Sequence, residues 1–304
     1  MIRNSINLKQ LEAFVAVVDF GTFRNAAAHL GTTQPNISAR IAALESGIDA
    51  LLMRRDAGSV TLTEKGRTLL PAARRVLWSA EAFLEEAHRT DLIADKLRLG
   101  VTEIVAGAWL NAYLRRLREV YPSLTVELTV NLSREIERDL ASGDLDLSLQ
   151  TAPFAIDMPS AIELGEYEYN WVAAPFVADE FSSPLSLADA MESAVLMHAK
   201  HTTASVELLE AARLRGLRTD RVVHSNSLAS CIQMAVDGLG LALAPRALTA
   251  RLVSRGELHV MPSDWRPSPL RIFARYDDRR APRFVAAAAR LAAEVERASG
   301  AHLG

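Results

Sequence analysis

Residues 22–45, TFRNAAAHLGTTQPNISARIAALE, decide the fold of the first part of the chain. The alanines at 26–28 allow two helices to cross closely, and Gly31 permits a tight turn between them. Thr22 can cap the first helix and Thr33 the second. The second helix carries apolar residues at helical spacing, namely Ile37, Ile41 and Leu44. Two short helices joined by a glycine turn predict a helix-turn-helix.

The outward side of the second helix is polar and has no acidic residue. Its side chains are Thr33, Gln34, Asn36, Ser38 and Arg40. Amide and guanidinium groups can pair with base edges, and hydroxyls can reach bases or phosphates. Pro35 is tolerated because N–H groups in the first turn have no helical partner. We expect this helix to read DNA, although an ordinary solvated face would have a similar composition.

The flanking segments extend this unit. Asn7 and Gln10 can cap a preceding helix that ends at Gly21. Residues 51–62 contain two short apolar strands around a turn at 56–59, which predicts a wing. The candidate DNA contacts are Thr22, Thr33, Gln34, Pro35, Asn36, Ser38, Arg40, Arg54, Arg55 and Thr63, with Thr61 and Lys65 as further phosphate contacts.

Residues 64–88 predict a long helix with an apolar seam. The seam alternates by three and four, through Leu70, Ala73, Leu77, Ala80, Leu84 and Ala87. Such a heptad pattern favours packing against a second copy of the helix. The alternative is that the seam packs on the chain's own domain. Pro71 can kink the helix near its start.

Beyond a polar connection at 90–96, strands and helices alternate. The predicted strands lie near 97–101, 124–130, 145–149, 171–174, 194–198, 221–224, 241–244 and 270–276. The predicted helices are one that ends near 121, three over 133–140, 203–215 and 228–237, and one that begins at 281. This order predicts mostly parallel sheets covered by helices on both faces.

Composition and charge limit the class of protein. Of the 304 residues, 49% are hydrophobic and 23% are charged, as in folded domains. We find neither a secretory signal nor a membrane-spanning run, and the single cysteine, Cys231, excludes an intrachain disulfide. These features favour a cytoplasmic protein that does not contact a membrane. Residues 1–78 hold ten Lys or Arg and six Asp or Glu, a charge of +4, so the remainder sums to −7. A basic end suits contact with DNA.

The N-terminal unit resembles the DNA-binding domain of LysR-type transcriptional regulators. The matching stretches are LKQLEAFVAVVDFGTFRNAAAHL (8–30), TTQPNISARIAALE (32–45) and VTLTEKG (60–66). Its signature positions here are Gln34-Pro35, Ser38, Leu44-Glu45, Leu62-Thr63 and Gly66. Asp49 departs from the usual glycine, and Ala39-Arg40 replaces a longer polar pair. The resemblance implies an individual base preference at Arg40 and pairing of subunits through residues 64–88.

The rest of the chain resembles the effector domain of the same family. The matching pieces are LRLGVTE (97–103), YPSLTVEL (121–128), LASGDLDLSL (140–149) and MAVDGLGLALAP (234–245). The resemblance implies an α+β multidomain protein with a winged helix-turn-helix at 1–65 and a linker or dimerisation helix at 66–91. It also implies a two-lobed, periplasmic-binding-protein-like α/β effector domain at 92–304. Lobe I would comprise 97–165 with 268–300, and lobe II 166–267.

Ligands of open α/β sheets bind beyond the carboxyl ends of strands, at helix N-termini. That rule and the resemblance select Thr102, Glu103, Ser133, Gln150, Thr151, His201, Thr202, Thr203, Ser225 and Asn226 as effector-binding candidates. The hydroxyl and amide groups suit a small carboxylate or similar anion, although each could simply cap a helix. Glu103 would repel an anion and suits a cationic or hydroxylated group.

Other chemistry is not indicated. His198 and His201 are three apart, but an expected strand-to-loop break between them disfavours zinc. Cys231 lies among apolar residues of a predicted helix, which favours a core position over redox sensing. We find no phosphate-cradling loop, nucleophile elbow or other catalytic constellation. We therefore expect no enzyme activity, no metal and no cofactor.

The predicted function is regulation of transcription. A homodimer or homotetramer would place the helices containing residues 33–40 in successive major grooves of double-stranded operator DNA. A small-molecule effector between the lobes would change the spacing of these helices. RNA polymerase is a further candidate partner. The alternatives are an enzyme built on a two-lobed body and a ligand-blind protein that shapes DNA.

Overall fold

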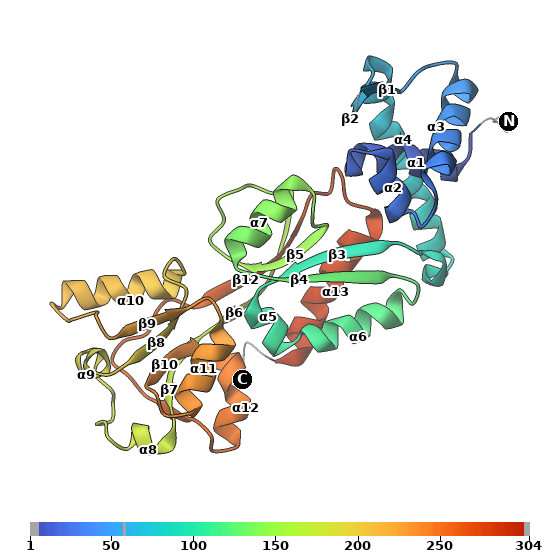
Figure 1. Ribbon diagram of the computed structural model, residues 1–304. Coiled ribbons are helices and arrows are strands. Elements are labelled where there is room, and N and C mark those ends of the chain that lie inside the picture. The colour runs from blue at the N-terminus through green and yellow to red at the C-terminus, as the bar shows by residue number, and fades with distance from the viewer. Residues whose placement is uncertain (1–5, 57–58, 301–304) are drawn as a thin grey trace. The chain divides into compact units, whose positions relative to one another are not determined.

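The computed structural model describes residues 6–56 and 59–300, and Figure 1 shows its helices and strands. The chain divides into two compact units. The first contains the residues up to 97 together with 118–127 and 277–287. The second contains 98–117, 128–276 and the residues from 288 onward.

The head, defined as the described residues from 6 to 86, is a winged helix-turn-helix followed by a long helix. Its elements are α1 (Leu8–Phe20), α2 (Phe23–His29), α3 (Gln34–Ile48), β1 (Met53–Asp56), β2 (Ser59–Leu62) and α4 (Glu64–Glu86). Phe14, Val17, Ile37 and Leu52 are buried in its core. β1 and β2 pair antiparallel as a wing. The predicted helix-turn-helix and wing are therefore confirmed.

Local capping determines where the first helices begin. Asn7 and Gln10 form the predicted capping box, with side-chain-to-backbone hydrogen bonds of 3.1 and 2.9 Å. Thr22 Oγ1 accepts a backbone N–H from the first turn of α2 at 3.1 Å. Thr33 stands at the cap position of α3, but its side chain makes no capping hydrogen bond. Pro35 removes one of the N–H groups that such a cap normally receives, so this part of the prediction was wrong.

Helix α4 continues through Pro71. Its predicted seam faces its own unit, with Leu70 and Ala73 in the head core and Leu77, Ala80 and Leu84 at a cavity beside that core. The expectation that this seam packs on a second copy is therefore wrong for Leu70 and Ala73, because α1 packs against α4. A different pair of apolar side chains, Val76 and Phe83, is exposed seven residues apart.

The first body sheet has the strand order β4-β3-β5-β12-β6. Its strands are β3 (Lys96–Val101), β4 (Thr125–Val130), β5 (Leu147–Thr151), β6 (Ser160–Tyr167) and β12 (Leu270–Tyr276). The helical elements connected to it are η1 (Thr90–Leu92), α5 (Glu103–Ala108), α6 (Leu110–Val120), α7 (Ser133–Ser142) and α13 (Arg283–Ser299).

The second body sheet has the strand order β11-β7-β10-β8-β9. Its strands are β7 (Tyr169–Ala173), β8 (Val195–His198), β9 (Val222–Ser225), β10 (Leu241–Pro245) and β11 (His259–Met261). Its helices are α8 (Pro175–Ala178), α9 (Leu187–Glu192), α10 (Thr203–Leu214), α11 (Leu228–Val236) and α12 (Arg246–Ser254).

Both sheets are mixed, which corrects the expectation of mostly parallel sheets. β3 pairs parallel with β5, and β8 pairs parallel with β9 and β10. β12 is antiparallel to β5 and β6, and β7 is antiparallel to β10 and β11. The antiparallel strands include those by which the chain crosses between sheets, from β6 to β7 and back into β12. The two lobes are therefore connected by crossing strands, as the resemblance implied.

Candidate functional site

The exposed side of α3 is narrower and less polar than predicted. Gln34, Pro35 and Asn36 are exposed, whereas Ser38 and Arg40 are half-buried. At about 100° per residue, positions 38 and 40 lie on opposite flanks of the helix. The exposed ridge between them consists of small residues, namely Ala39, Ala42, Ala43 and Ser46. Such a ridge permits a close approach to a groove, with polar side chains at its N-terminal end and along its flanks.

Polar bonds hold the wing against the helices. Glu45 Oε1 accepts the backbone N–H of Leu52 at 2.7 Å. Thr63 Oγ1 donates to the Leu51 carbonyl at 2.7 Å and accepts the N–H of Gly66 at 2.9 Å. A Cβ at Gly66 would lie 2.1 Å from the Leu52 carbonyl oxygen, so only glycine fits there. These residues therefore position the wing, and the Thr63 hydroxyl is already engaged.

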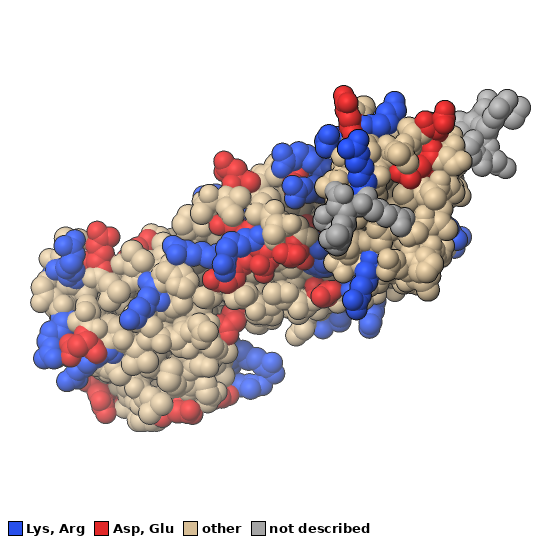
Figure 2. Space-filling view, turned by 45° about the horizontal axis from the view of Figure 1, so that its top comes forward, with Lys and Arg blue, Asp and Glu red and all other residues tan. Residues whose placement is uncertain are grey.

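The remaining candidate DNA contacts differ in whether their side chains already make a hydrogen bond or an ion pair. The Asn36 side-chain amide donates to Thr32 Oγ1 at 2.7 Å. Arg54 is exposed on β1 and has no ion-pair partner among the described side chains. The side chain of Arg55 lies outside the described part of the molecule. On the face shown in Figure 2, basic and acidic side chains are interspersed. The described residues on the face in this view therefore form no continuous basic patch.

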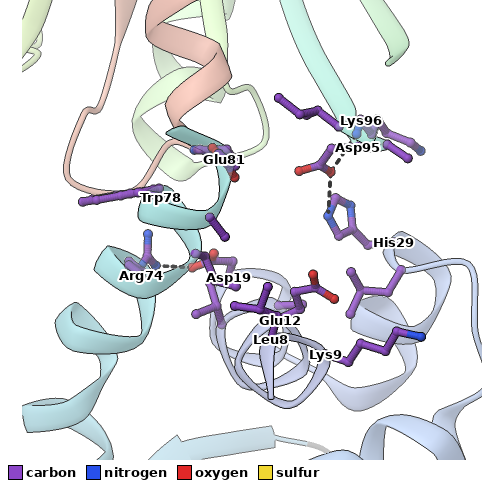
Figure 3. A pocket seen from close by; sticks show the side chains of 18 of the residues that line it. Leu8, Lys9, Glu12, Asp19, His29, Arg74, Trp78, Glu81, Asp95 and Lys96 are labelled. Carbon is purple, nitrogen blue, oxygen red and sulfur yellow. Dashed lines mark hydrogen bonds and ion pairs between the residues drawn. The ribbon is translucent and has the colours of Figure 1, made fainter. Parts of the chain in front are cut away.

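A cavity of about 670 Å³, which we call the head cavity, lies within the first unit beside α1, α2 and α4. Figure 3 shows that its walls carry two ion pairs. Arg74 binds the Asp19 carboxylate and donates to the Arg280 carbonyl at 2.8 Å. His29 Nε2 lies 3.4 Å from Asp95 Oδ1. These pairs tie segments far apart in the sequence into one unit.

Two further residues that line the head cavity are Arg40, a predicted DNA contact, and Glu81, whose pKa is raised. Arg40 lines it, which places this predicted base reader on the flank of α3. Glu81 accepts the N–H of Arg283, at the start of α13, at 2.7 Å. Burial raises the pKa of Glu81 to about 7, against the opposing effect of this hydrogen bond. Glu81 therefore titrates near neutral pH.

A second cavity, which we call the cleft, has a volume of about 430 Å³ and lies in the second unit. Eight of the ten predicted effector residues line it, namely Thr102, Glu103, Ser133, Thr151, His201, Thr202, Thr203 and Asn226. They follow strands of both sheets or begin α5, α7 and α10. The rule that ligands bind beyond strand ends therefore brings together residues that lie far apart in the sequence.

The other two predicted effector residues do not line the cleft. Gln150 is fully buried in β5, where alternation along the strand turns it away from the face of Thr151. Neither polar atom of the Gln150 amide has a hydrogen-bond partner in the described chain. Ser225 Oγ accepts the N–H of Ser227 at 3.1 Å.

The polar groups of the cleft favour a negatively charged ligand. Thr102 is 6% exposed, and its hydroxyl has no hydrogen-bond partner among the described residues. Arg134 is exposed in the first turn of α7 and has no ion-pair partner there. Ser133 and Thr151 hydroxyls share a hydrogen bond of 2.6 Å. The N-termini of α7 and α10 add their partial positive charge.

A buried ion pair fixes one wall of the cleft. Arg275 Nη1 lies 2.9 Å from Glu137 Oε1, and both side chains are buried. Glu137 also accepts the backbone N–H groups of Ala155 and Ile156. Burial alone would raise the pKa of Glu137, but the Ile156 N–H and the Arg275 guanidinium outweigh it and lower the pKa. The same guanidinium stacks 3.8 Å from the Phe154 ring centroid, so this wall is rigidly held.

Sequence reasoning missed several residues of the cleft, namely Arg134, Phe154, Tyr169, His198 and Leu270. Arg134 follows the predicted Ser133, so its place at a helix start was a usable signal. The three apolar or aromatic side chains come from a loop and from crossing strands, where nothing local marks a ligand. His198 was weighed only as a zinc ligand, and the described residues contain no metal-binding group of three His, Cys, Asp or Glu.

Comparison with known families identifies both parts of the chain. The model for the LysR substrate binding domain matches residues 90–297. The model for the bacterial regulatory helix-turn-helix protein of the lysR family matches residues 8–67. The chain belongs to the LysR family.

This LysR-family protein has both regulators and full-length structures among its relatives. It is 31% identical over 255 residues to a probable hydrogen peroxide-inducible genes activator of Mycobacterium avium, which covers 82% of this chain and 80% of the relative. A full-length variant of OxyR from Pseudomonas aeruginosa has a TM-score of 0.62 and 21% identity, with 98% of this chain and 97% of that chain covered. Full-length LysG from Corynebacterium glutamicum with bound effector Arg has a TM-score of 0.58 and 20% identity, with 96% and 99% covered. The two structures show a common fold.

Membership of the LysR family confirms the predicted class. LysR-type proteins are DNA-binding transcriptional regulators that carry an effector-binding domain and form oligomers, and they are not enzymes. The enzyme alternative is therefore excluded. In the part of the chain that the structure describes, no helix has both the length and the apolar character needed to cross a membrane.

Proposed function

We propose that this LysR-type regulator binds promoter DNA through α3 and the wing, and that a small organic anion in the cleft controls this binding. The observation that carries the proposal is the set of free polar groups in the cleft. Among the described residues, the buried Thr102 hydroxyl has no hydrogen-bond partner, and Arg134, at a helix N-terminus, has no ion-pair partner. An anion would satisfy both groups. We propose that 1–65 form the DNA-binding domain, 66–91 the linker and 92–304 the effector domain.

In the proposed complex, some residues of the head contact bases, others contact phosphates, and others position the elements that carry these contacts. Gln34 and Asn36 contact base edges, with Arg40 on the flank, while Arg54 and Arg55 contact phosphates. Thr22 and Thr63 position the elements that carry these contacts. A homodimer or homotetramer presents two or four copies of α3 to successive grooves, and binding at a promoter places the protein where RNA polymerase acts. Ligand binding changes lobe closure and thereby the spacing of the α3 helices.

A response to peroxide through a thiol is a second candidate, because relatives are named as hydrogen peroxide-inducible genes activators. The chain has one cysteine, and Cys231 is fully buried. Its thiol donates to the Met197 carbonyl at 3.2 Å, and burial raises its pKa. A buried, protonated thiol is a poor nucleophile. We therefore favour occupancy of the cleft by a ligand over oxidation of a thiol.

Fluorescence anisotropy with DNA flanking the protein's own gene tests the proposed base contacts. Gln34→Ala should weaken binding by about 1–3 kcal/mol and relax preference at one base position. Arg54→Ala should weaken binding to all sequences similarly and reduce the salt dependence. Glu210→Gln, an exposed change on α10, serves as the control. If Gln34→Ala bound every single-base operator variant with the same proportional loss, its role as a base reader would be refuted.

The same assay tests the cleft when a panel of small carboxylates is added. Thr102→Val and Arg134→Ala should abolish the change in DNA affinity caused by the active carboxylate, while affinity without it stays the same. Arg138→Ala, one turn further along α7 and outside the cleft, should respond as the wild type does. An undiminished response in both cleft variants would contradict the proposed site.

A further inference from the structure

The carboxylate of Glu103 spans the cleft. Glu103 is the first residue of α5, which follows a strand of the first sheet, whereas α11 belongs to the second sheet. One carboxylate oxygen accepts the Ser227 hydroxyl at 3.1 Å, and the other accepts the backbone N–H of Leu228. His198 Nε2 lies 3.8 Å from the same carboxylate. The side chain therefore joins one lobe to the first turn of a helix in the other.

This contact satisfies the positive end of α11 from within the chain. Ser227 is the cap residue of α11 and also accepts the N–H of Ser230 at 3.2 Å. Leu228 is the first helical residue, whose N–H has no partner inside the helix. A carboxylate at this position is favoured by the helix dipole and by a charge-assisted hydrogen bond. Glu103 thus supplies the kind of group that an acidic effector would otherwise bring.

No carboxylate among the described residues accepts a backbone N–H at the start of α7 or α10. The first turn of α10 contains no acidic residue. The first turn of α7 contains Glu135, which pairs with Arg138 at 3.3 Å and does not line the cleft. Arg134 in the same turn has no ion-pair partner among the described side chains. A negative charge already fixed at α11 repels a second one placed beside it. In the cleft, the start of α11 is therefore already occupied by a carboxylate, whereas the starts of α7 and α10 remain open to an anion.

We propose that Glu103 is a positioning residue that acts as a built-in anion. It ties the two lobes together in the absence of effector, and it directs the acidic group of the effector away from α11 toward α7 and α10. The first part concerns the protein alone. The second part rests on the proposed function of the cleft as the effector site.

Double electron–electron resonance on the full-length protein tests the lobe contact. Spin labels at Arg138→Cys on α7 and Arg213→Cys on α10 report the lobe separation in a Cys231→Ala background, since both arginines are exposed. Without any ligand, Glu103→Ala should shift the mean separation by more than about 2 Å and broaden its distribution. Glu103→Gln should give a smaller shift, because its amide oxygen can still accept the Leu228 N–H although it carries no charge. Glu210→Gln should leave the distribution unchanged.

Hydrogen exchange gives a second readout on the same variants. Amides at the start of α11 should exchange faster in Glu103→Ala than in Glu210→Gln, and Ser227→Ala should show part of that increase. Identical spin-label distributions and identical exchange at residues 228–230 in Glu103→Ala and Glu210→Gln would overturn the proposal.

Inorganic phosphate serves as the probe for the second part. At matched ionic strength, phosphate should raise the melting temperature of Glu103→Ala more than that of the wild type, because the start of α11 is then open to an anion. An equal shift in both proteins would overturn the directing role of Glu103. If no carboxylate changes DNA binding but Glu103→Ala still opens the lobes, the proposed function fails and the lobe contact stands.

Discussion

Asp49 stands where the family usually has glycine, and the backbone conformation at the end of α3 explains why aspartate is tolerated there. Asp49 ends α3 with a φ of 52° and a ψ of 44°, in the left-handed region. Glycine adopts this conformation without steric cost, and aspartate is among the few other residues that tolerate it. The usual glycine of the family is therefore explained by backbone geometry, and Asp49 keeps the same turn.

This geometry predicts the order of stability of two variants. Asp49→Ala should unfold about 1 kcal/mol more easily than Asp49→Gly, because alanine pays the steric cost of a positive φ. Urea denaturation followed by circular dichroism measures the difference. Equal midpoints for the two variants would show that the left-handed turn is not retained in solution.

Cys231 gives a second prediction at this scale. Because its thiol is fully buried and burial raises its pKa, we expect negligible labelling by a maleimide in the native protein at pH 7. In denaturing urea, one label per chain should be incorporated, and mass spectrometry counts it. Rapid labelling of the native protein would favour the thiol-based response to peroxide.

The residue scale also shows what local sequence can and cannot predict. The caps at Asn7 and Thr22 were predictable because each depends on residues within one turn. The cleft residues that begin helices after strands were predictable from a topological rule. The prediction that Gln150 lines the cleft was wrong, because successive residues of a strand point to opposite sides and Gln150 points away from the side of Thr151. Phe154 was missed because the Glu137–Arg275 pair, which joins distant segments, holds its loop in place.

At the element scale, α4 carries two apolar surfaces with different uses. One faces the head core and the head cavity, and the other exposes Val76 and Phe83, with 72% of Phe83 exposed. Periodicity predicted a long helix with an apolar seam but could not say which surface the head itself would cover. That depends on α1, whose contact with α4 is a tertiary interaction.

The exposed pair on α4 predicts a surface for self-association. Phe83→Glu should weaken oligomer formation, because burying a large apolar side chain contributes about 1.5–3 kcal/mol, whereas a carboxylate there opposes burial. Leu214→Glu, at an exposed apolar position on α10 away from this surface, is the matched control. Sedimentation velocity at a series of concentrations compares the two. Unchanged association of Phe83→Glu would place the subunit contact elsewhere.

Glu81 on the same helix predicts a dependence of stability on pH. Its pKa in the folded protein is about 7 and its ordinary value is 4.5, so folding favours the protonated form. This contribution is complete below pH 4.5 and is lost as the pH rises through 7. Glu81→Gln should therefore gain stability relative to the wild type between pH 5 and pH 8, by about 2 kcal/mol. Thermal melts across this range test it, and parallel profiles for the two proteins would contradict it.

The sequence did not predict some of the elements or the order of the strands in the sheets. β6 was missed because it is an edge strand whose exposed positions include Glu163 and Glu166, so its apolar alternation is weak. α12 was also missed. The antiparallel entry of β12 follows from the return of the chain to the first sheet, which no local pattern encodes.

In the whole molecule, the head and the cleft belong to different compact units. The head has its own core, and the cleft lies in the other unit. A ligand that binds only the cleft should stabilise the cooperative unit that contains it, by about 2.7 kcal/mol at a hundred times its dissociation constant. Differential scanning calorimetry with a binding carboxylate should therefore show a ligand-dependent shift, and Arg134→Ala should abolish it. A shift of equal size in Arg134→Ala would place the ligand outside the cleft.

The position of β12 has a consequence for synthesis on the ribosome. Residues 270–276 form the strand between β5 and β6, although both of those strands are translated much earlier. The core of the head is complete by residue 73, so the head can fold while translation continues. The nascent first sheet, in contrast, waits with two unpaired strand edges until nearly the whole polypeptide has emerged. During that interval its open strand edges can pair with other chains or be bound by a chaperone.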